Sequence, residues 1–128
     1  MDTTLPIEVA PQFARAAGFR HRVIITAAAW NATVAWSDLD TEQTGALQDE
    51  VGREMDVLTM AAAAVRAAER AGQRGVLDAP FTVRRIPRGV PYLGDDDEDG
   101  AYEALTVVGM YVIVGGTPTT VTISLDDE

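Results

Sequence analysis

The stretch from Thr41 to Gly72 constrains the fold of this chain more than any other part of its sequence. It reads TEQTGALQDEVGREMDVLTMAAAAVRAAERAG, and its apolar residues recur at helical spacing, as on the buried face of a helix. Alanine, the strongest helix former, dominates its second half. Acids precede arginines along it, which suits the helix dipole. We expect one long helix or two collinear pieces, with Gly52 marking a kink or a close crossing. The expected apolar face comprises Leu47, Val51, Leu58, Ala62 and Val65.

Two shorter helices are predicted before this one. Pro11 to Ala17 has proline in its first turn and is followed by Gly18, a helix stop signal. Thr26 to Ser37 forms the second, with Thr26 as its N-cap. Leu5 to Val9 is expected to be a short extended piece. Candidate N-caps for the long helix are Ser37, Asp38, Asp40 and Thr41.

After Gly75 the pattern changes from helical to alternating, which is typical of strands. We predict strands at Phe81–Ile86, Glu103–Val114 and Thr119–Leu125. The second strand is apolar on both faces, so it should be central and covered twice. The sequence therefore predicts a single α+β domain over 1–128, with two or three N-terminal helices (about 1–75) packed on a C-terminal three-stranded antiparallel sheet (76–128). The N-terminal segment or another subunit should cover the far face of the sheet.

Composition argues against most kinds of enzyme. The 128 residues include no cysteine, which excludes disulfides, thiolate metal sites and cysteine nucleophiles. There is no lysine, so no phosphate-binding loop of the usual kind, and the lone histidine, His21, stands in no triad pattern. The beginning MDTTLPIE lacks the features of a signal peptide, and the apolar runs are too short to span a bilayer. We expect a cytoplasmic protein of a bacterial host, without catalytic residues or cofactors.

Charged residues on the long helix form a candidate cluster. Asp49, Arg53 and Asp56 are spaced so that they share one side of the helix, and we predict that they form a structural ladder of ion pairs. If Asp49 and Arg53 are buried, they should fix a neighbouring chain segment. The alternative is that these carboxylates, with Glu50 and Glu54 nearby, hold a metal or transfer protons.

Surplus negative charge lies in the last third of the chain. Residues 1–89 hold eleven acids and ten arginines, whereas residues 90–128 hold nine acids and no base. Asp95, Asp97 and Asp99 match the first half of a calcium-binding EF-hand loop, but Thr106 stands where that loop needs glutamate. A solvated loop tip is therefore favoured over a metal site. The predicted partner-binding residues are Asp95, Asp96, Asp97, Glu98, Asp99 and Glu103.

Two segments of the chain, residues 7–30 and 48–66, resemble a small family known only as a domain of unknown function, which occurs in bacterial chromosomes, plasmids and phages. The resemblance follows the pattern AGFR…W…QDE-x-GR-x-x-DVL. Here its pieces are Ala17-Gly18-Phe19-Arg20, Trp30, Gln48-Asp49, Gly52-Arg53 and Asp56-Val57-Leu58. The Tyr-Thr-Arg-Ala-Gln beginning of many members is missing, and the Asp-rich insert is a further departure. The family has no known activity to carry over, so the resemblance implies only a context, an accessory gene on a mobile element.

These observations predict a non-enzymatic accessory protein of phage or mobile-element origin that binds another protein, with a homodimer as one form. One alternative is an anti-defence inhibitor whose acidic C-terminal third imitates nucleic acid. The second is a small metal-dependent enzyme that uses the helix carboxylates. Neither a membrane nor direct nucleic-acid binding is expected, because polyanion affinity needs a basic face and the net charge is −10.

Overall fold

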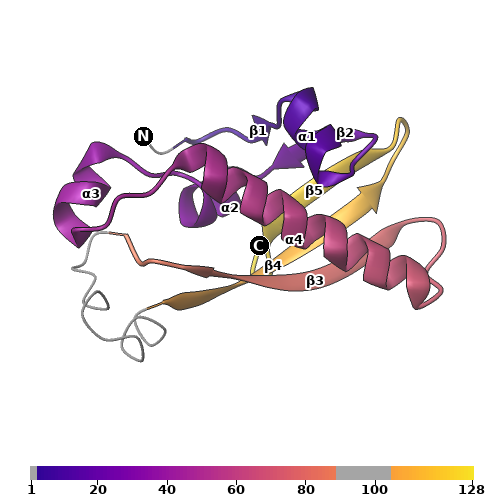
Figure 1. The fold of residues 1–128 in the computed structure, drawn as a ribbon. Helices are drawn as coiled ribbons and strands as arrows, with labels where there is room; N and C mark the ends of the chain where they lie inside the picture. The colour runs from indigo at the N-terminus through magenta and orange to yellow at the C-terminus, as the bar shows by residue number, and fades with distance from the viewer. Residues whose placement is uncertain (1–2, 89–104) are drawn as a thin grey trace.

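The computed structural model describes residues 3–88 and 105–128 and shows a sheet with helices packed on one face (Figure 1). The elements in chain order are β1 (Ile7–Glu8), α1 (Pro11–Ala17), β2 (Arg22–Ile25), α2 (Ala27–Thr33), α3 (Asp38–Thr44), α4 (Glu50–Arg70), β3 (Leu77–Arg85), β4 (Thr106–Gly115) and β5 (Thr120–Leu125). The α+β class is as predicted.

The predicted three-stranded antiparallel sheet is wrong. The sheet has five strands in the described residues, in the order β1-β2-β5-β4-β3. Strand β2 pairs in parallel with β5, with Val23 beside Val121 and Ile25 beside Ile123, whereas the other neighbours are antiparallel. The N-terminal segment therefore extends the sheet sideways and places β5, rather than β4, at its centre.

The structure confirms the local sequence signals for the two short N-terminal helices. Helix α1 has the predicted bounds and ends at Gly18, whose φ of 104° is a left-handed conformation that glycine adopts without strain. Thr26 caps α2, because its Oγ1 accepts a hydrogen bond of 3.2 Å from the N–H of Ala29. Helix α2 is shorter than predicted and ends at Thr33.

The stretch from Thr41 to Gly72 is not one helix. It divides between α3 and α4, which point in different directions (Figure 1). The break lies at Gly45, which ends α3 with a φ of 77°, and Gly52 lies within the first turn of α4 without interrupting it. Ser37 caps α3 in a capping box with Asp40. Asp49 caps α4.

The core lies between α4 and the sheet. Val57, Leu58 and Ala61 of α4 are fully buried against inward side chains of the strands, among them Met110 and Val112. Burying a side chain such as Leu58 contributes about 1.5–3 kcal/mol. Helices α1 and α2 contact α4 and add Ala14 and Ala29 to the same core.

The predicted apolar face of the long helix is only partly correct. Leu47 and Val51 are 84% and 47% exposed, because Leu47 precedes α4 and Val51 lies on its outer side. At the same end of α4 the buried positions are Arg53 and Glu54. Charged side chains therefore occupy the place where the sequence predicts apolar ones.

Candidate functional site

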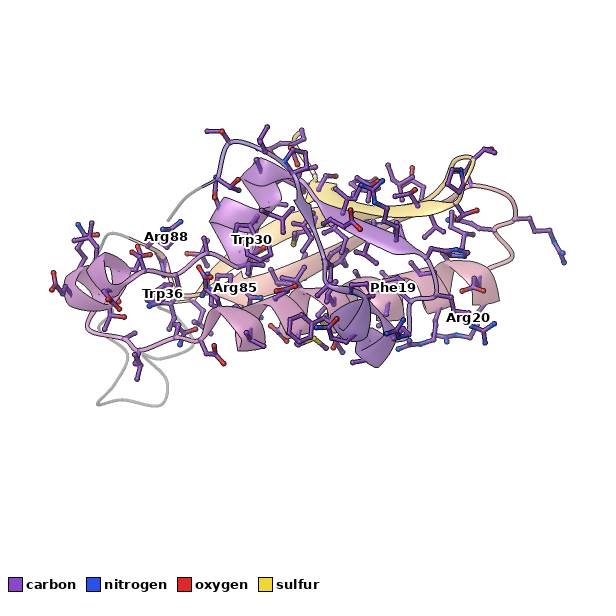
Figure 2. The ribbon with its side chains drawn as sticks, turned by 90° about the horizontal axis from the view of Figure 1, so that it is seen from above. Phe19, Arg20, Trp30, Trp36, Arg85 and Arg88 are labelled. Carbon is purple, nitrogen blue, oxygen red and sulfur yellow. The ribbon has the colours of Figure 1, made fainter. Side chains whose placement is uncertain are left out.

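Three arginines from different parts of the chain converge near the segment that joins α2 to α3. They are Arg53 of α4, Arg85 at the end of β3, and Arg88 beyond it. Figure 2 shows Arg85, Arg88 and Trp36 toward the same end of the molecule, far from Phe19 and Arg20 at the other. Each arginine hydrogen-bonds a backbone carbonyl of residues 31–34. This arrangement ties the helices to the sheet.

Arg85 is buried and joins β3 to two helices. Its Nε donates to the carbonyl of Thr33 at 2.7 Å, and its Nη2 donates to the carbonyl of Arg53 at 3.2 Å. Its Nη1 forms an ion pair of 2.9 Å with Oδ2 of Asp56. Every nitrogen of this guanidinium therefore has a partner.

Arg88 joins the segment after β3 to α2 and α3. Its Nε and Nη2 contact Oδ2 of Asp40 at 3.0 and 2.9 Å, and its Nη1 donates to the carbonyl of Asn31 at 2.9 Å. Burial alone would raise the pKa of Asp40, but hydrogen bonds from Arg88 and Ser37 outweigh it and hold that pKa below its usual value. The Asp40 carboxylate therefore stays ionised in its capping box.

Arg53 is buried less favourably than Arg85. Its Nε donates to the carbonyl of Val34 at 2.9 Å, and its guanidinium carbon lies 4.9 Å from the ring centroid of Trp36. Its Nη2 is buried without a hydrogen-bond partner. Burial, followed by the nearby charges of Arg85 and Arg88, lowers the pKa of Arg53 to about 10. The planar guanidinium of Arg53 therefore packs against Trp36 with one of its nitrogen donors unsatisfied.

Asp49 and Asp56 have partners other than Arg53. Asp49 is exposed, and its Oδ1 accepts from the N–H of Val51 at 3.2 Å. Asp56 pairs with Arg85. In the part of the chain that the structure describes, no ion pair joins Arg53 to either carboxylate. Arg53 is buried and fixes the 34–36 segment, but Asp49 is not buried with it.

Within residues 3–88 and 105–128, no three histidine, cysteine or carboxylate side chains are grouped so that they could hold a metal ion. The predicted partner-binding and calcium candidates, Asp95 to Asp99 and Glu103, lie outside the described residues.

A hollow of about 400 Å³ lies beside the buried ring of Phe19, between α1 and β2. Arg15, Arg20 and Arg22 stand among its lining residues, and Arg22 is paired with Glu8 at 2.8 Å. This basic end of the molecule is separate from the arginine cluster around Trp36 (Figure 2).

Another candidate site is the sheet face opposite the helices, which we call the open face. It is formed by residues that alternate with the buried ones, and among the described residues no helix packs on it. Its outward side chains on β4 include Val107 and Ile113, which are 56% and 41% exposed. Tyr111 of β4 is half-buried between them, and Ile24 of β2 is half-buried two strands away, beyond Thr122 of β5. The open face therefore carries an apolar patch on β4, which the carboxylate of Asp126 divides where it lies over Gly109, between Val107 and Tyr111.

Two opposite charges flank this patch on β3. Asp78 is paired with Ile113 across the strands, and Arg84 is paired with Val107. Both side chains are exposed. Neither takes part in an ion pair or a side-chain hydrogen bond within the described chain. The open face thus presents charges of both signs, and the carboxylate of Asp126 adds an acid over Gly109.

The exposed edge of the sheet at β3 is blocked in part. The side chain of Gln73 bonds both the N–H and the carbonyl of Asp78, at 3.0 Å each. Since backbone groups point outward at every second residue, the next outward position is Pro80, which has no N–H. The other edge strand, β1, is two residues long. Both devices discourage strand addition, which leaves the open face as the main accessible surface of the sheet.

The sequence did not reveal this surface as a site. The available signal for an exposed apolar surface was that the sequence of β4 is apolar on both faces. Which outward residues lie together depends on the register of β3, β4 and β2, and Asp78 and Arg84 become neighbours of the patch only through that register.

Comparisons with protein-family models, with curated proteins and with solved structures find no match to this chain. In the described residues no helix is both long and apolar enough to cross a membrane.

Proposed function

We propose that this protein acts without catalysis, by binding another protein through the open face of its sheet. The observation that carries the proposal is the exposure of Val107 and Ile113 on a sheet face that no helix of the described chain covers. Apolar side chains gathered on one surface mark interaction sites more often than scattered ones do. A protein partner suits this surface because it combines an apolar patch with charges of both signs.

The buried arginine cluster also supports a role without catalysis. Its guanidinium groups are engaged by carbonyls of the chain and by Asp40 and Asp56, so their first role is to hold the fold. An accessory role on a mobile element is part of the proposal and rests on the family resemblance alone. Imitation of nucleic acid depends mainly on Asp95 to Asp99 and Glu103, which lie outside the described residues, and stays a prediction.

The test compares protein capture by three immobilised forms of the chain: wild type, Ile113→Glu on the open face, and Leu47→Glu as a matched control. Leu47 is also an exposed large apolar residue, but it lies in the α3–α4 connection. Bacterial lysate is passed over each form and bound proteins are quantified by mass spectrometry.

We expect wild type and Leu47→Glu to capture the same protein, and Ile113→Glu to lose it. Circular dichroism and thermal melting of the three forms show whether the variants are folded. Equal capture by all three folded forms would show that the open face does not bind the partner.

A further inference from the structure

We infer that the hollow beside Phe19, between α1 and β2, binds a small anion: a phosphate or carboxylate carried on a flat apolar group. This site is separate from the open face, and it takes a small molecule rather than a protein, so it goes beyond the proposed function. An apolar floor, a rim of arginines and the unpaired charges on that rim point to this class of ligand.

The floor of the hollow is apolar, and its size suits a small molecule. Ala14 of α1, Phe19 and Val23 of β2 line the hollow, and all three are buried. Its volume of about 400 Å³ lies within the range that is usual for ligand pockets, roughly 300–1,000 Å³. A ligand therefore meets apolar surface at the bottom of the hollow, which favours a flat apolar group such as an aromatic ring.

The rim of the hollow is basic. Arg15 of α1, Arg20 and His21 of the connection to β2, and Arg22 at the start of β2 are exposed residues of its lining. A guanidinium group presents its donors in a planar fork, which matches the oxygens of a phosphate or a carboxylate. The rim therefore suits an anionic group, in contrast to the floor.

Two of the three rim arginines have no partner in the described chain. The acid of the rim, Glu8, is engaged by Arg22, whose Nη2 and Nε lie 2.8 and 2.9 Å from its Oε1. Within residues 3–88 and 105–128, neither Arg15 nor Arg20 takes part in an ion pair or a side-chain hydrogen bond. Their donors are therefore available to an anion from solution.

The charge at this end of the molecule is opposite to that of the whole chain. The net charge is −10, whereas the hollow is lined by three arginines and one carboxylate. Arg66 of α4 adds a further cation, because its Nη1 lies 3.8 Å from the place that a Cβ on Gly18 would take. Like charges gathered in this way repel one another, and an anion bound among them relieves the repulsion.

The helix dipole accounts for only part of this basic character. Arg15 lies in the last turn of α1 and Arg66 reaches the C-cap Gly18, so both suit the negative end of that helix. Arg20 lies beyond the helix, and Figure 2 shows it close to Phe19 and far from Trp36. The described fold gives Arg20 no partner, whereas an anion in the hollow does.

An adjoining hollow of about 450 Å³ lies toward α4 and shares Phe19, Arg20 and His21 with the first. Its lining includes Glu69, which has no ion pair within the part of the chain that the structure describes. An unpaired carboxylate repels an anion, whereas the acid of the first hollow is already paired with Arg22. The anion is therefore assigned to the first hollow.

The test uses four probes that separate the two parts of the ligand. Naphthyl phosphate and naphthoate each carry an anion and a flat apolar ring, naphthol carries the ring alone, and inorganic phosphate carries the charge alone. Each is titrated into the isotopically labelled full chain, and the amide shifts in the NMR spectrum give both the dissociation constant and the place of binding.

Both naphthyl anions should bind and should shift the amides of residues 19–23. For a ligand of about fifteen non-hydrogen atoms we expect a dissociation constant of about 0.5 mM, and naphthol and inorganic phosphate should bind at least about tenfold more weakly. The tighter of the two naphthyl anions shows whether the natural ligand carries a phosphate or a carboxylate.

Three variants test the role of the rim. Arg15→Gln and Arg20→Gln each remove one exposed charge from it, so each should weaken the binding of naphthyl phosphate by roughly three- to tenfold and leave that of naphthol unchanged. Arg84→Gln is the matched control, because Arg84 is also exposed and unpaired but lies beside Arg85 at the other end of the molecule. It should bind naphthyl phosphate as wild type does.

Binding of naphthyl phosphate that is no tighter than that of naphthol would overturn the inference. So would amide shifts that are confined to the open face, or equal binding by wild type, Arg15→Gln and Arg20→Gln. Unchanged binding of naphthol shows that the variants are folded. None of these results decides the proposed function, which depends on lysate capture by Ile113→Glu.

Discussion

Arg85 and Arg53 are both buried guanidinium groups, but they differ in how fully their donors are used. Arg85 bonds the carbonyls of Thr33 and Arg53 and pairs with Asp56. Arg53 makes one short hydrogen bond, to Val34, and leaves Nη2 unsatisfied. Since an unpaired buried donor costs free energy, the two residues should not be equally important for stability.

We predict that Arg85→Met lowers the free energy of unfolding by about 2–4 kcal/mol, because it leaves the carbonyl of Thr33 without its partner and removes the ion pair to the exposed carboxylate of Asp56. Arg53→Met should cost only about 1–2 kcal/mol, because it loses the hydrogen bond to Val34 and a long one of 3.5 Å to Gln48, but also removes an unsatisfied donor. Urea unfolding of both variants measures the difference. A larger loss for Arg53→Met than for Arg85→Met would contradict this account.

Glu54 is a buried carboxyl whose pKa is raised by burial and then by the nearby charge of Glu50. A carboxyl with a higher pKa in the folded state favours folding when it is protonated. Its contribution is therefore fully present below the unfolded value, near 4.5, and is lost as the pH rises through the folded value.

Glu54→Gln keeps the side chain neutral, so we expect it to raise the urea midpoint at pH 7 and to have little effect at pH 4. Glu69→Gln, at an exposed position of the same helix, is the matched control and should change the midpoint less. The measurement is urea unfolding across pH 4–8. A stabilisation by Glu54→Gln that is as large at pH 4 as at pH 7 would show that the charge is not its cause.

At the scale of elements, the sequence predicted the helix bounds and strand patterns that neighbouring residues in the chain determine. Helix α1 has its predicted bounds because proline at its start and Gly18 at its end are local signals. Strand β5 follows its predicted alternation for the same reason. Strand β2 was missed because its four residues are held by β5, almost a hundred residues later in the chain, and no local pattern reports such a pairing.

The division of the long helix shows the other limit of local reasoning. The segment around Gly45 has enough helical character for one continuous helix, but α4 is turned so that Arg53 reaches Val34 and Trp36. Those contacts exist only after the chain has folded back, so they were not available from periodicity. The prediction of a buried charge cluster identified Arg53 and Asp56 as residues of interest, although the partner of Asp56 is Arg85.

The edge of β3 gives a prediction at this scale. Gln73 occupies the backbone groups of Asp78, and Pro80 removes the next outward donor. We expect Gln73→Ala combined with Pro80→Val to expose a row of backbone donors and acceptors, and therefore to increase aggregation.

Light scattering during incubation at high micromolar concentration measures this effect. Gln12→Ala, at an exposed glutamine of α1, is the control and should stay as soluble as wild type. If the double variant stays equally soluble, the edge is protected by some other feature.

At the scale of the whole molecule, the described chain has two faces with different roles. Helices α1, α2 and α4 cover one face of the sheet and share its core. The arginine cluster holds that layer at one end through contacts to residues 31–34. The open face contributes nothing to this core, so substitutions on it should change association more than folding.

This separation predicts that a charge placed on the open face leaves the fold intact. A glutamate at position 113 projects from the open face, outside the core, so Ile113→Glu should lower the Tm by no more than about 4 °C relative to wild type. Leu47→Glu, at another exposed apolar position, should behave in the same way. Calorimetry of the three forms measures this, and an Ile113→Glu form that melts far below wild type would show that the open face does not have the role assigned to it.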